Sequence, residues 1–401
     1  MRILCVATKA PWPPNDGGRL ALWLTLQGLA DAGHKIALVV PDASGADASS
    51  DEYTELRAVC TLHFVPVRSR SYAIHAINSL LTWTPLSIVK HASDEVANAV
   101  TERARQFQPD VIHAEQLQAV ANCAGVAASG VPLLLRMQNV ESELWNQLSR
   151  SGGWRRLMAL EGRRLKRHET MVLRNSDQTT TLTGRDALTL RDMVPREIKA
   201  RIACIAPEFP SELPTAATVT GQPAVALSGS SGWWPNAQGS RWFFDTVWPA
   251  VHAAFPAADV HVYGGSLVRA ANVHCHPAPV DSIEAFPQNA IVVVPIQVAS
   301  GIRMRILEAW ARGLPVIATT VAARGLDVET YRQLIIADSA NDYVSALRAL
   351  SLDGSLRERL VTNGREYLRR HHNRTDATQA LLDGYARAAS AATMKISRDA
   401  A

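Results

Sequence analysis

The chain has 401 residues, which at roughly 100 to 200 residues per domain predicts two or three domains. Apolar residues make up 47% of it and charged residues 19%, a composition that excludes a disordered or collagen-like protein. The net charge of +4, from 41 basic and 37 acidic residues, is too small to indicate a nucleic-acid-binding protein.

Cysteines and hydropathy indicate a cytoplasmic location. The five cysteines lie far apart in the chain, so no pair has the spacing of a zinc or redox motif, and no disulfide framework is implied. The apolar start of the chain is too short for a signal peptide, and no window has the length of a membrane-spanning helix. We expect a soluble protein that is at most peripheral to a membrane.

The first half of the chain alternates between apolar strands and amphipathic helices. It opens with a strand over residues 2–7, a Pro- and Gly-rich loop over 11–18, a helix over 20–32 and a strand over 35–40. Further strands are predicted at 62–67, 110–114, 133–137, 178–182 and 202–206, and helices at 94–108 and 154–174. Strands this apolar are typical of a parallel sheet that is covered on both faces.

A second α/β unit follows a segment without periodicity. Residues 207–223 are rich in Pro, Ser, Thr and Ala, as expected of a linker between domains. Beyond it, strands are predicted at 224–227, 259–263, 290–295, 315–319 and 333–337, helices at 236–255 and 302–312, and a helical tail from residue 341. We therefore predict two open parallel-sheet domains, 1–207 and 208–401, with a ligand crevice at the carboxyl ends of their strands, in the cleft between them.

The segment 294–320 carries the clearest sign of chemistry. It predicts a buried strand, a loop of small residues and a helix that starts near Ile302. Backbone amides at that helix start, with Arg303 and Arg305 beside them, would bind a diphosphate, and Glu308 two turns later would accept hydrogen bonds from ribose hydroxyls. The alternative is an ordinary strand–helix–strand unit with a solvated Arg/Glu face.

These residues resemble a known signature. The run from Ser300 to Ile317, followed by Gly325-Leu326, is similar to the donor site of the retaining GT-B glycosyltransferases of group 1, also called family 4. Three other stretches agree with this family: Gly17-Gly18-Arg19, residues 110–114, and Gly229 to Asn236 with the tryptophans that follow. The resemblance implies two Rossmann-like domains, a C-terminal helix that crosses back to the first domain, and a hexosyltransferase type of activity.

The resemblance also implies roles for individual residues. It places Glu308 on the ribose and the loop with Gly301, Ile302 and Arg303 on the diphosphate, where Arg303 would stabilise the leaving group. Gly17 and Gly18 would close over the phosphates, and Asn236 would also contact the donor. The nucleotide base would lie against the backbone near Val280. A nucleoside-diphosphate sugar would be the co-substrate, transfer would retain the anomeric configuration, and no metal would be obligatory.

Three positions depart from the common signature. Ser300 stands where many members of the family have a second glutamate. The match is particularly close to a bacterial branch of the family, and this branch is expected to present backbone amides there instead. The basic residues that often hold the diphosphate from the first strand of the second domain are replaced by Ser230 and Pro235. Arg303 and Arg305 would then be the basic residues aimed at the charge, with Arg305 in the place of a lysine.

In the first domain, polar residues follow two predicted strands. His113 and Glu115 share one face of a strand end, and the family's pattern there indicates a catalytic role, although a buried structural histidine is the plainer interpretation. Asn139 and Glu141 follow the next strand and are predicted to lie on the acceptor side. Capping of a helix by Asn139 or Ser142 is the alternative.

The predicted acceptor is a glycan or a lipid-linked glycan in bacterial surface polysaccharide synthesis. A basic helical run, 155–168, and an apolar segment, 73–88, would rest on the inner face of an anionic membrane, unless the basic run is merely a solvated helix. Rival interpretations are a sugar-nucleotide epimerase or hydrolase and a non-catalytic binder. An oxidoreductase with Asp42 on the ribose is disfavoured, because residues 8–18 are not a GxGxxG turn.

Overall fold

The computed structural model describes residues 1–68, 71–150, 152–229, 233–264 and 268–399. Contacts divide the chain into two units. The first contains residues 1–12, 22–207 and 375–401, and the second contains residues 13–21 and 208–374. The C-terminal tail, expected to cross back, packs with the first unit.

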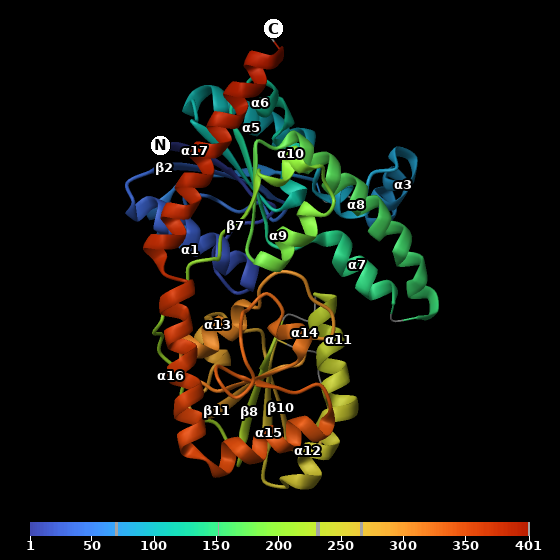
Figure 1. The fold of residues 1–401 in the computed structure, drawn as a ribbon, viewed down its shortest axis with the longest axis vertical. Helices are drawn as coiled ribbons and strands as arrows, with labels where there is room; N and C mark the ends of the chain where they lie inside the picture. The colour runs from blue at the N-terminus through green and yellow to red at the C-terminus, as the bar shows by residue number, and fades with distance from the viewer. Residues whose placement is uncertain (69–70, 151, 230–232, 265–267, 400–401) are drawn as a thin grey trace. The chain divides into compact units, whose positions relative to one another are not determined.

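The first unit is built on a parallel sheet of seven strands in the order β3-β2-β1-β4-β5-β6-β7 (Figure 1). The strands are β1 (Arg2–Val6), β2 (Lys35–Asp42), β3 (Thr61–Pro66), β4 (Val111–Glu115), β5 (Leu133–Met137), β6 (Gln178–Thr181) and β7 (Ile202–Cys204). β1 pairs with both β2 and β4, so the direction of the strand order reverses beside it. Ligands of open α/β sheets bind outside the carboxyl ends of strands at such a point.

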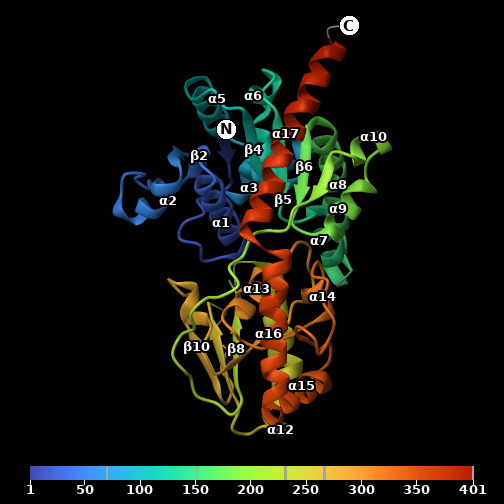
Figure 2. The same cartoon turned by 60° about the vertical axis from the view of Figure 1, so that its left-hand side comes forward.

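Helices cover this sheet (Figures 1 and 2). They are α1 (Gly17–Asp31), α2 (Thr54–Val59), α3 (Tyr72–Thr82), α4 (Leu86–His91), α5 (Asp94–Phe107), α6 (Ala124–Ala128), α7 (Glu141–Ser149), α8 (Met158–Asn175), α9 (Gly184–Arg191), α10 (Arg196–Lys199) and α17 (Arg374–Asp399). Val96 and Val100 of α5 and Leu165 of α8 pack into the core formed by β1, β4 and β5. On α17, Gly384 lies so close to Leu134 that a Cβ there would sit 3.2 Å from it.

The second unit has a parallel sheet of six strands in the order β10-β9-β8-β11-β12-β13. They are β8 (Ala224–Ser228), β9 (Asp259–Tyr263), β10 (Val273–His276), β11 (Ala290–Val294), β12 (Val316–Ala318) and β13 (Ile335–Ile336). Its helices are α11 (Trp234–Trp242), α12 (Trp248–Ala254), α13 (Met304–Ala311), α14 (Thr320–Ala323), α15 (Ala340–Leu352) and α16 (Gly354–His371). Two parallel sheets with covering helices confirm the predicted fold class.

Three local predictions differ from the structure. The helix expected over 236–255 is interrupted by a π-helical turn, Phe243–Val247, which joins α11 to α12 ahead of Pro249. The helix expected from Ile302 begins at Met304, and residues 300–303 form the loop before it. β10 was not predicted, because its sequence, Val-His-Cys-His, lacks the apolar character of the other strands.

Candidate functional site

A cavity of about 330 Å³ lies at the carboxyl ends of β8 and β9 in the second unit. Residues just after these strands, the first turns of α13, and the N-terminal segment that groups with this unit line it. They include Ser228, Gly229, Tyr263, Gly264, Ala278, Pro279, Ser282, Phe286, Met304, Arg305, Glu308, Asn15, Asp16, Gly17 and Arg19. The cavity therefore brings together Gly17, Arg305 and Glu308, three of the residues predicted to bind the donor.

Glu308 is a buried carboxylate that is held in place from one side. Arg312, one helical turn later, donates to its Oε1 from Nη2 at 2.8 Å and from Nε at 3.2 Å. The Arg312 guanidinium is itself fixed by the hydroxyl of Ser282 at 3.1 Å, by the carbonyl of Pro214, and by the ring of Phe286 beneath it. Among the described residues, nothing donates a hydrogen bond to Oε2. Glu308 thus has one oxygen fixed and one available on the cavity wall.

Arg305 supplies a positive charge to the same wall. Burial lowers the pKa of its guanidinium to about 10, with Glu308 acting in the opposite direction, so the group remains charged at neutral pH. Within the part of the chain that the structure describes, no carboxylate forms an ion pair with it. A half-buried charge whose nearby carboxylate is not in ion-pair contact is only partly compensated, and a bound anion would complete that compensation.

Gly229 allows the strand end to approach Arg305. A Cβ at this position would lie 3.1 Å from Nη1 of Arg305 and 3.0 Å from the Asn236 side chain. Asn236, with Gly229 and Arg305, also lines a second cavity of about 260 Å³ between β8 and α11. Ser230 falls outside the described residues, whereas Pro235 is buried in the first turn of α11 and has no charge to offer.

The loop before α13 is buried and holds Arg303 away from the cavity. Ser300, Gly301 and Ile302 are buried, and Gly301 has the positive φ of +73° that favours glycine. Arg303 donates to the carbonyl of Ser300, and its guanidinium lies 5.1 Å from the centre of the Trp233 ring. Arg305, rather than Arg303, is the arginine that lines the cavity.

The remaining residues predicted to bind the donor lie at the margin of the cavity or outside its lining. Val280 is 82% exposed and is not part of the lining, although Ala278, Pro279 and Ser282 around it are. Gly17 packs so close to Met304 that a Cβ would lie 3.3 Å from its side chain. Gly18 is next to it in α1 but does not line the cavity.

In the first unit, His113 and Glu115 form a buried network at the end of β4. Nε2 of His113 lies 2.9 Å from Glu115, which also accepts from Gln138 at 2.7 Å and from Arg136 at 3.5 Å. Burial works against the charged carboxylate, but Arg136, His113 and Gln138 together outweigh it and hold the pKa of Glu115 below its usual range. Glu115 is therefore ionised at neutral pH.

Tyr385 completes this network from α17. Burial raises the pKa of its phenol well above the usual value, so the hydroxyl keeps its proton, and it lies 2.6 Å from Nδ1 of His113. Nε2 of His113 donates to Glu115, because an ionised carboxylate can only accept. This satisfied, buried arrangement matches the structural alternative for His113, and no sequence pattern pointed to its partner Tyr385.

Asn139 and Glu141 lie at the start of α7. The residue that caps this helix is Val140, not Asn139 or Ser142. Ser142 instead donates from its amide and hydroxyl to the buried carboxylate of Glu169, at 3.1 and 2.5 Å. Burial raises the pKa of Glu141, against the hydrogen bond from Gln118, and raises that of Glu169 to about 7. Sequence reasoning missed Glu169, which lies in the run of basic residues of α8.

Two models of protein families match the chain. One, described as "Glycosyl transferases group 1", matches residues 222–353, and the other, "Glycosyl transferase 4-like domain", matches residues 16–205. A protein of Klebsiella pneumoniae, described as an uncharacterized 44.6 kDa protein in the cps region, is 31% identical over 87 residues, which are 22% of each chain.

Solved structures resemble the whole fold. Sucrose-phosphate synthase from Thermosynechococcus elongatus has a TM-score of 0.72 at 14% identity, over 96% of this chain and 99% of that one. HepE from Anabaena, in complex with UDP and glucose, has a TM-score of 0.67 at 14% identity, over 96% and 98%. A variant of TarM from S. aureus, in complex with fondaparinux, alpha-GlcNAc-glycerol and UDP, has a TM-score of 0.69 at 10% identity, over 96% and 99%.

Proposed function

The chain belongs to the group 1 glycosyltransferases and has the GT-B fold, and from this we propose that it moves a sugar from a nucleoside diphosphate to a glycan acceptor. The observation that carries the proposal is the pair on the cavity wall of the second unit: Arg305, which forms no ion-pair contact with a carboxylate among the described residues, and Glu308, whose Oε2 accepts no hydrogen bond there. A nucleoside diphosphate offers the two groups that such a pair binds, a dianion and a vicinal diol.

Glu308 would bind the ribose. Because Arg312 already holds Oε1, the hydroxyls would donate to Oε2, and the carboxylate needs no rearrangement to receive them. Hydrogen bonds to a charged acceptor contribute about 1.5 to 3 kcal/mol each. HepE, whose structure contains UDP and glucose, supports this class of donor.

Arg305 would neutralise the diphosphate during transfer. Negative charge grows on the leaving diphosphate as the bond to the sugar breaks, and a guanidinium in a buried wall stabilises that charge more than it would in water. Arg303 would act indirectly, since its bond to the Ser300 carbonyl shapes the loop. Retention at the anomeric carbon, and a reaction without an obligatory metal, remain parts of the proposal that rest on the resemblance.

We assign His113 and Glu115 a role in positioning the carboxyl end of β4, and not in contact with the sugar. They are 1% and 2% exposed, and both ring nitrogens of His113 have partners. The network would therefore fix the carboxyl end of β4 and the residue after it, Gln116. The side-chain amide of Gln116 donates to Oε1 of Gln138 at 2.9 Å. Asn139 and Glu141 are kept on the acceptor side in the proposal.

The acceptor is proposed to be a glycan or lipid-linked glycan used for bacterial surface polysaccharide, at the inner face of the membrane. The K. pneumoniae protein of a cps region supports polysaccharide synthesis. None of the helices in the described part of the chain is both long and apolar enough to cross a membrane. We propose that association occurs through a surface of the first unit.

Helices α3 and α8 lie side by side in the first unit (Figure 1), and we propose that their exposed side chains form this surface. The guanidinium of Arg164 donates to the Ser79 hydroxyl at 2.8 Å and to the Thr84 carbonyl at 2.5 Å, and lies over the Trp83 ring. These contacts join the two helices. Exposed apolar side chains gather on both: Tyr72, Ile74, Ile77, Leu80, Leu81 and Trp83 on or just after α3, and Leu160 and Met171 on α8. Arg163, Lys166 and Arg167 are exposed beside them.

Two experiments test the proposal. A thermal-shift screen against UDP-, GDP- and dTDP-sugars, followed by release of the nucleoside diphosphate with and without added glycan acceptors, should show acceptor-dependent release. Release without acceptor would instead favour a hydrolase or epimerase. Co-sedimentation with anionic vesicles should be seen at low salt and weaken at high salt, because the basic residues interact within a Debye length. No sedimentation at low salt would remove the membrane from the proposal.

A further inference from the structure

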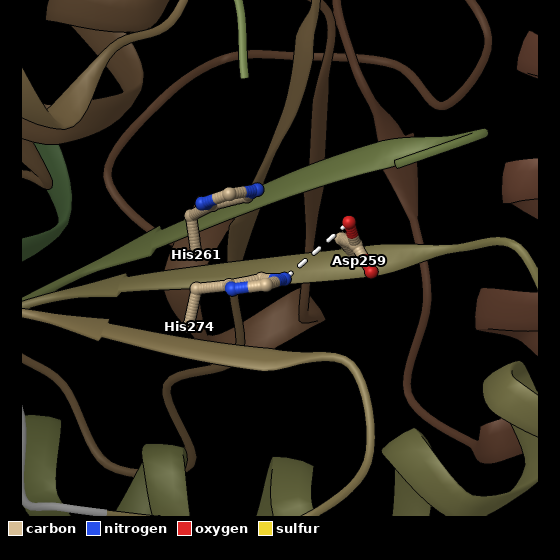
Figure 3. Close-up of side chains that lie close together, drawn as sticks. All are labelled: Asp259, His261 and His274. Carbon is tan, nitrogen blue, oxygen red and sulfur yellow. Dashed lines mark ion pairs between the residues drawn. The ribbon is translucent and has the colours of Figure 1, made fainter. Parts of the chain in front are cut away.

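Three side chains with metal-binding groups meet on one face of the sheet in the second unit. Asp259 and His261 alternate along β9, so both point to the same face, and His274 of the edge strand β10 is in register with His261. One ligand atom from each lies within 4.8 Å of the other two. Figure 3 shows the outer ends of both imidazoles and the Asp259 carboxylate directed at a common space.

One of the three distances between ligand atoms has the length that a tetrahedral zinc site requires. Zn–N and Zn–O bonds of about 2.0 to 2.1 Å require neighbouring ligand atoms to lie about 3.4 Å apart. Nε2 of His274 is 3.3 Å from Oδ2 of Asp259, and the two imidazole rings are stacked with centres 4.7 Å apart. The ligand atoms of all three residues lie within 4.8 Å of one another, so the side chain of His274, which is 45% exposed, has to turn toward His261 to close the site.

A carbonyl oxygen also reaches this point. Thr220 of the linker lies 3.0 Å from Nε2 of His261. The approach is possible because Gly221 follows: its φ is +112°, and a Cβ there would lie 2.7 Å from Asp259. The Thr220 oxygen, or a water, can provide the fourth ligand.

His276 supplies the outer support that zinc-bound histidines usually have. Its Nε2 lies 3.1 Å from Nδ1 of His261, so His261 can donate its Nδ1 proton to His276 and turn the Nε2 lone pair toward a metal. In the metal-free state, His261 donates its Nε2 proton to the Thr220 carbonyl and accepts at Nδ1 from Nε2–H of His276. Binding therefore needs a change of tautomer in both rings, and the metal replaces the Nε2–H bond to Thr220.

We propose that Asp259, His261 and His274 form a structural Zn²⁺ site that joins the edge strand β10 to β9 and to the linker at Thr220. The site takes no part in sugar transfer and goes beyond the proposed function. Its neighbour His276 stacks on Tyr263, with ring centres 4.4 Å apart, and Tyr263 lines the cavity of the second unit. Zinc would therefore stiffen the strand that carries one wall of that cavity.

Metal binding by the purified full chain tests the proposal directly. After removal of metals by a chelator, Zn²⁺ is titrated in competition with a chromophoric chelator, for the wild type, His274→Gln, Asp259→Asn and a control, His371→Gln. His371 is an exposed histidine of the same unit whose ring packs at an angle of 37° against Tyr367. The wild type and the control should bind one Zn²⁺ equally, and the two ligand variants should bind at least about 100-fold more weakly, since loss of an outer-shell partner alone costs about 10 to 100-fold.

Co²⁺ provides a second readout that needs no variant. Bound to the wild type, it should give the intense visible absorption of a four-coordinate ion. Absence of Zn²⁺ binding by the wild type, unchanged binding by His274→Gln and Asp259→Asn, or an octahedral Co²⁺ spectrum would each overturn the proposal. Because these readouts do not involve turnover, they stand apart from any failure of the proposed glycosyltransferase activity.

Discussion

Replacing Glu308 by alanine should weaken donor use strongly while leaving the protein folded. In the wild type, Arg312 holds Oε1, which leaves Oε2 for the ribose. One or two hydrogen bonds to a charged oxygen, at about 1.5 to 3 kcal/mol each and less for the second, correspond to about 2 to 4 kcal/mol in total. At 1.4 kcal/mol per factor of ten, we expect kcat/KM for the donor to fall by about 30- to 700-fold.

The substitution also removes the partner of Arg312, and this effect must be separated from the loss of ribose contacts. The guanidinium retains Ser282, the Pro214 carbonyl and the Phe286 ring, so its charge is not left without contacts. Glu308→Gln keeps the size of the side chain and a hydrogen-bond acceptor, and should lose less activity than the alanine variant. Thermal denaturation of each variant shows how much of the effect comes from stability.

A matched control comes from the same unit. Glu329 pairs with Arg332 at 2.9 Å, as Glu308 pairs with Arg312, but both side chains are largely exposed. Surface pairs of this kind contribute about 0 to 1 kcal/mol, so Glu329→Ala should leave donor kinetics unchanged. Steady-state kinetics over a range of donor concentrations make the comparison. Unchanged kinetics in Glu308→Ala would refute the assignment of Glu308 to the donor.

Three further substitutions test other groups. Arg305→Met keeps the packing of the side-chain stem but removes the charge, and should lower kcat by about 100-fold or more, as loss of one transition-state donor does; a kcat equal to that of the wild type would contradict this. Tyr385→Phe leaves Nδ1 of the buried His113 without its hydrogen-bond partner and should cost about 1 to 3 kcal/mol of unfolding free energy in urea, where an unchanged midpoint would argue against a role of this hydrogen bond in stability. Glu169 has its pKa raised to about 7 from 4.5, so the folded protein loses stability as pH rises from about 4.5 to about 7. Glu169→Gln should therefore match the wild type at pH 4 and be up to about 3 kcal/mol more stable at pH 8, and equal stability at pH 8 would show that burial does not disfavour the carboxylate.

The fold was predictable because its signal is repeated along the chain. The central strands β1, β2, β4 and β5 are almost entirely buried, and buried strands leave apolar runs that a sequence shows directly. The edge strand β10 was missed for the opposite reason. Only part of it is buried, and its histidines serve contacts with β9 rather than the core.

The donor site was predictable in composition but not in detail. Arg303 and Arg305 lie two residues apart, and the helix was expected to include both. Because α13 begins at Met304, Arg303 falls in the preceding loop and turns to Ser300 and Trp233, while Arg305 sits in the first turn and lines the cavity. The helix starts two residues later than expected, and local sequence cannot determine a helix start that accurately. This shift decides which of the two arginines places its charge on the cavity wall.

Buried polar networks show why the remaining side chains could not be assigned from sequence. His113 and Tyr385 are separated by most of the chain, yet the tyrosine hydroxyl is the partner of Nδ1, while Nε2 of the same ring is bonded to Glu115. The same holds for Ser142 with Glu169 and for His261 with Thr220. In each case, a residue's chemistry depends on a partner that only tertiary packing supplies, so a sequence motif can name the residue but not its protonation state. Measurements of tautomer and pKa at His113 and Glu169, by NMR of labelled protein, would therefore reveal more about these sites than further comparison of sequences.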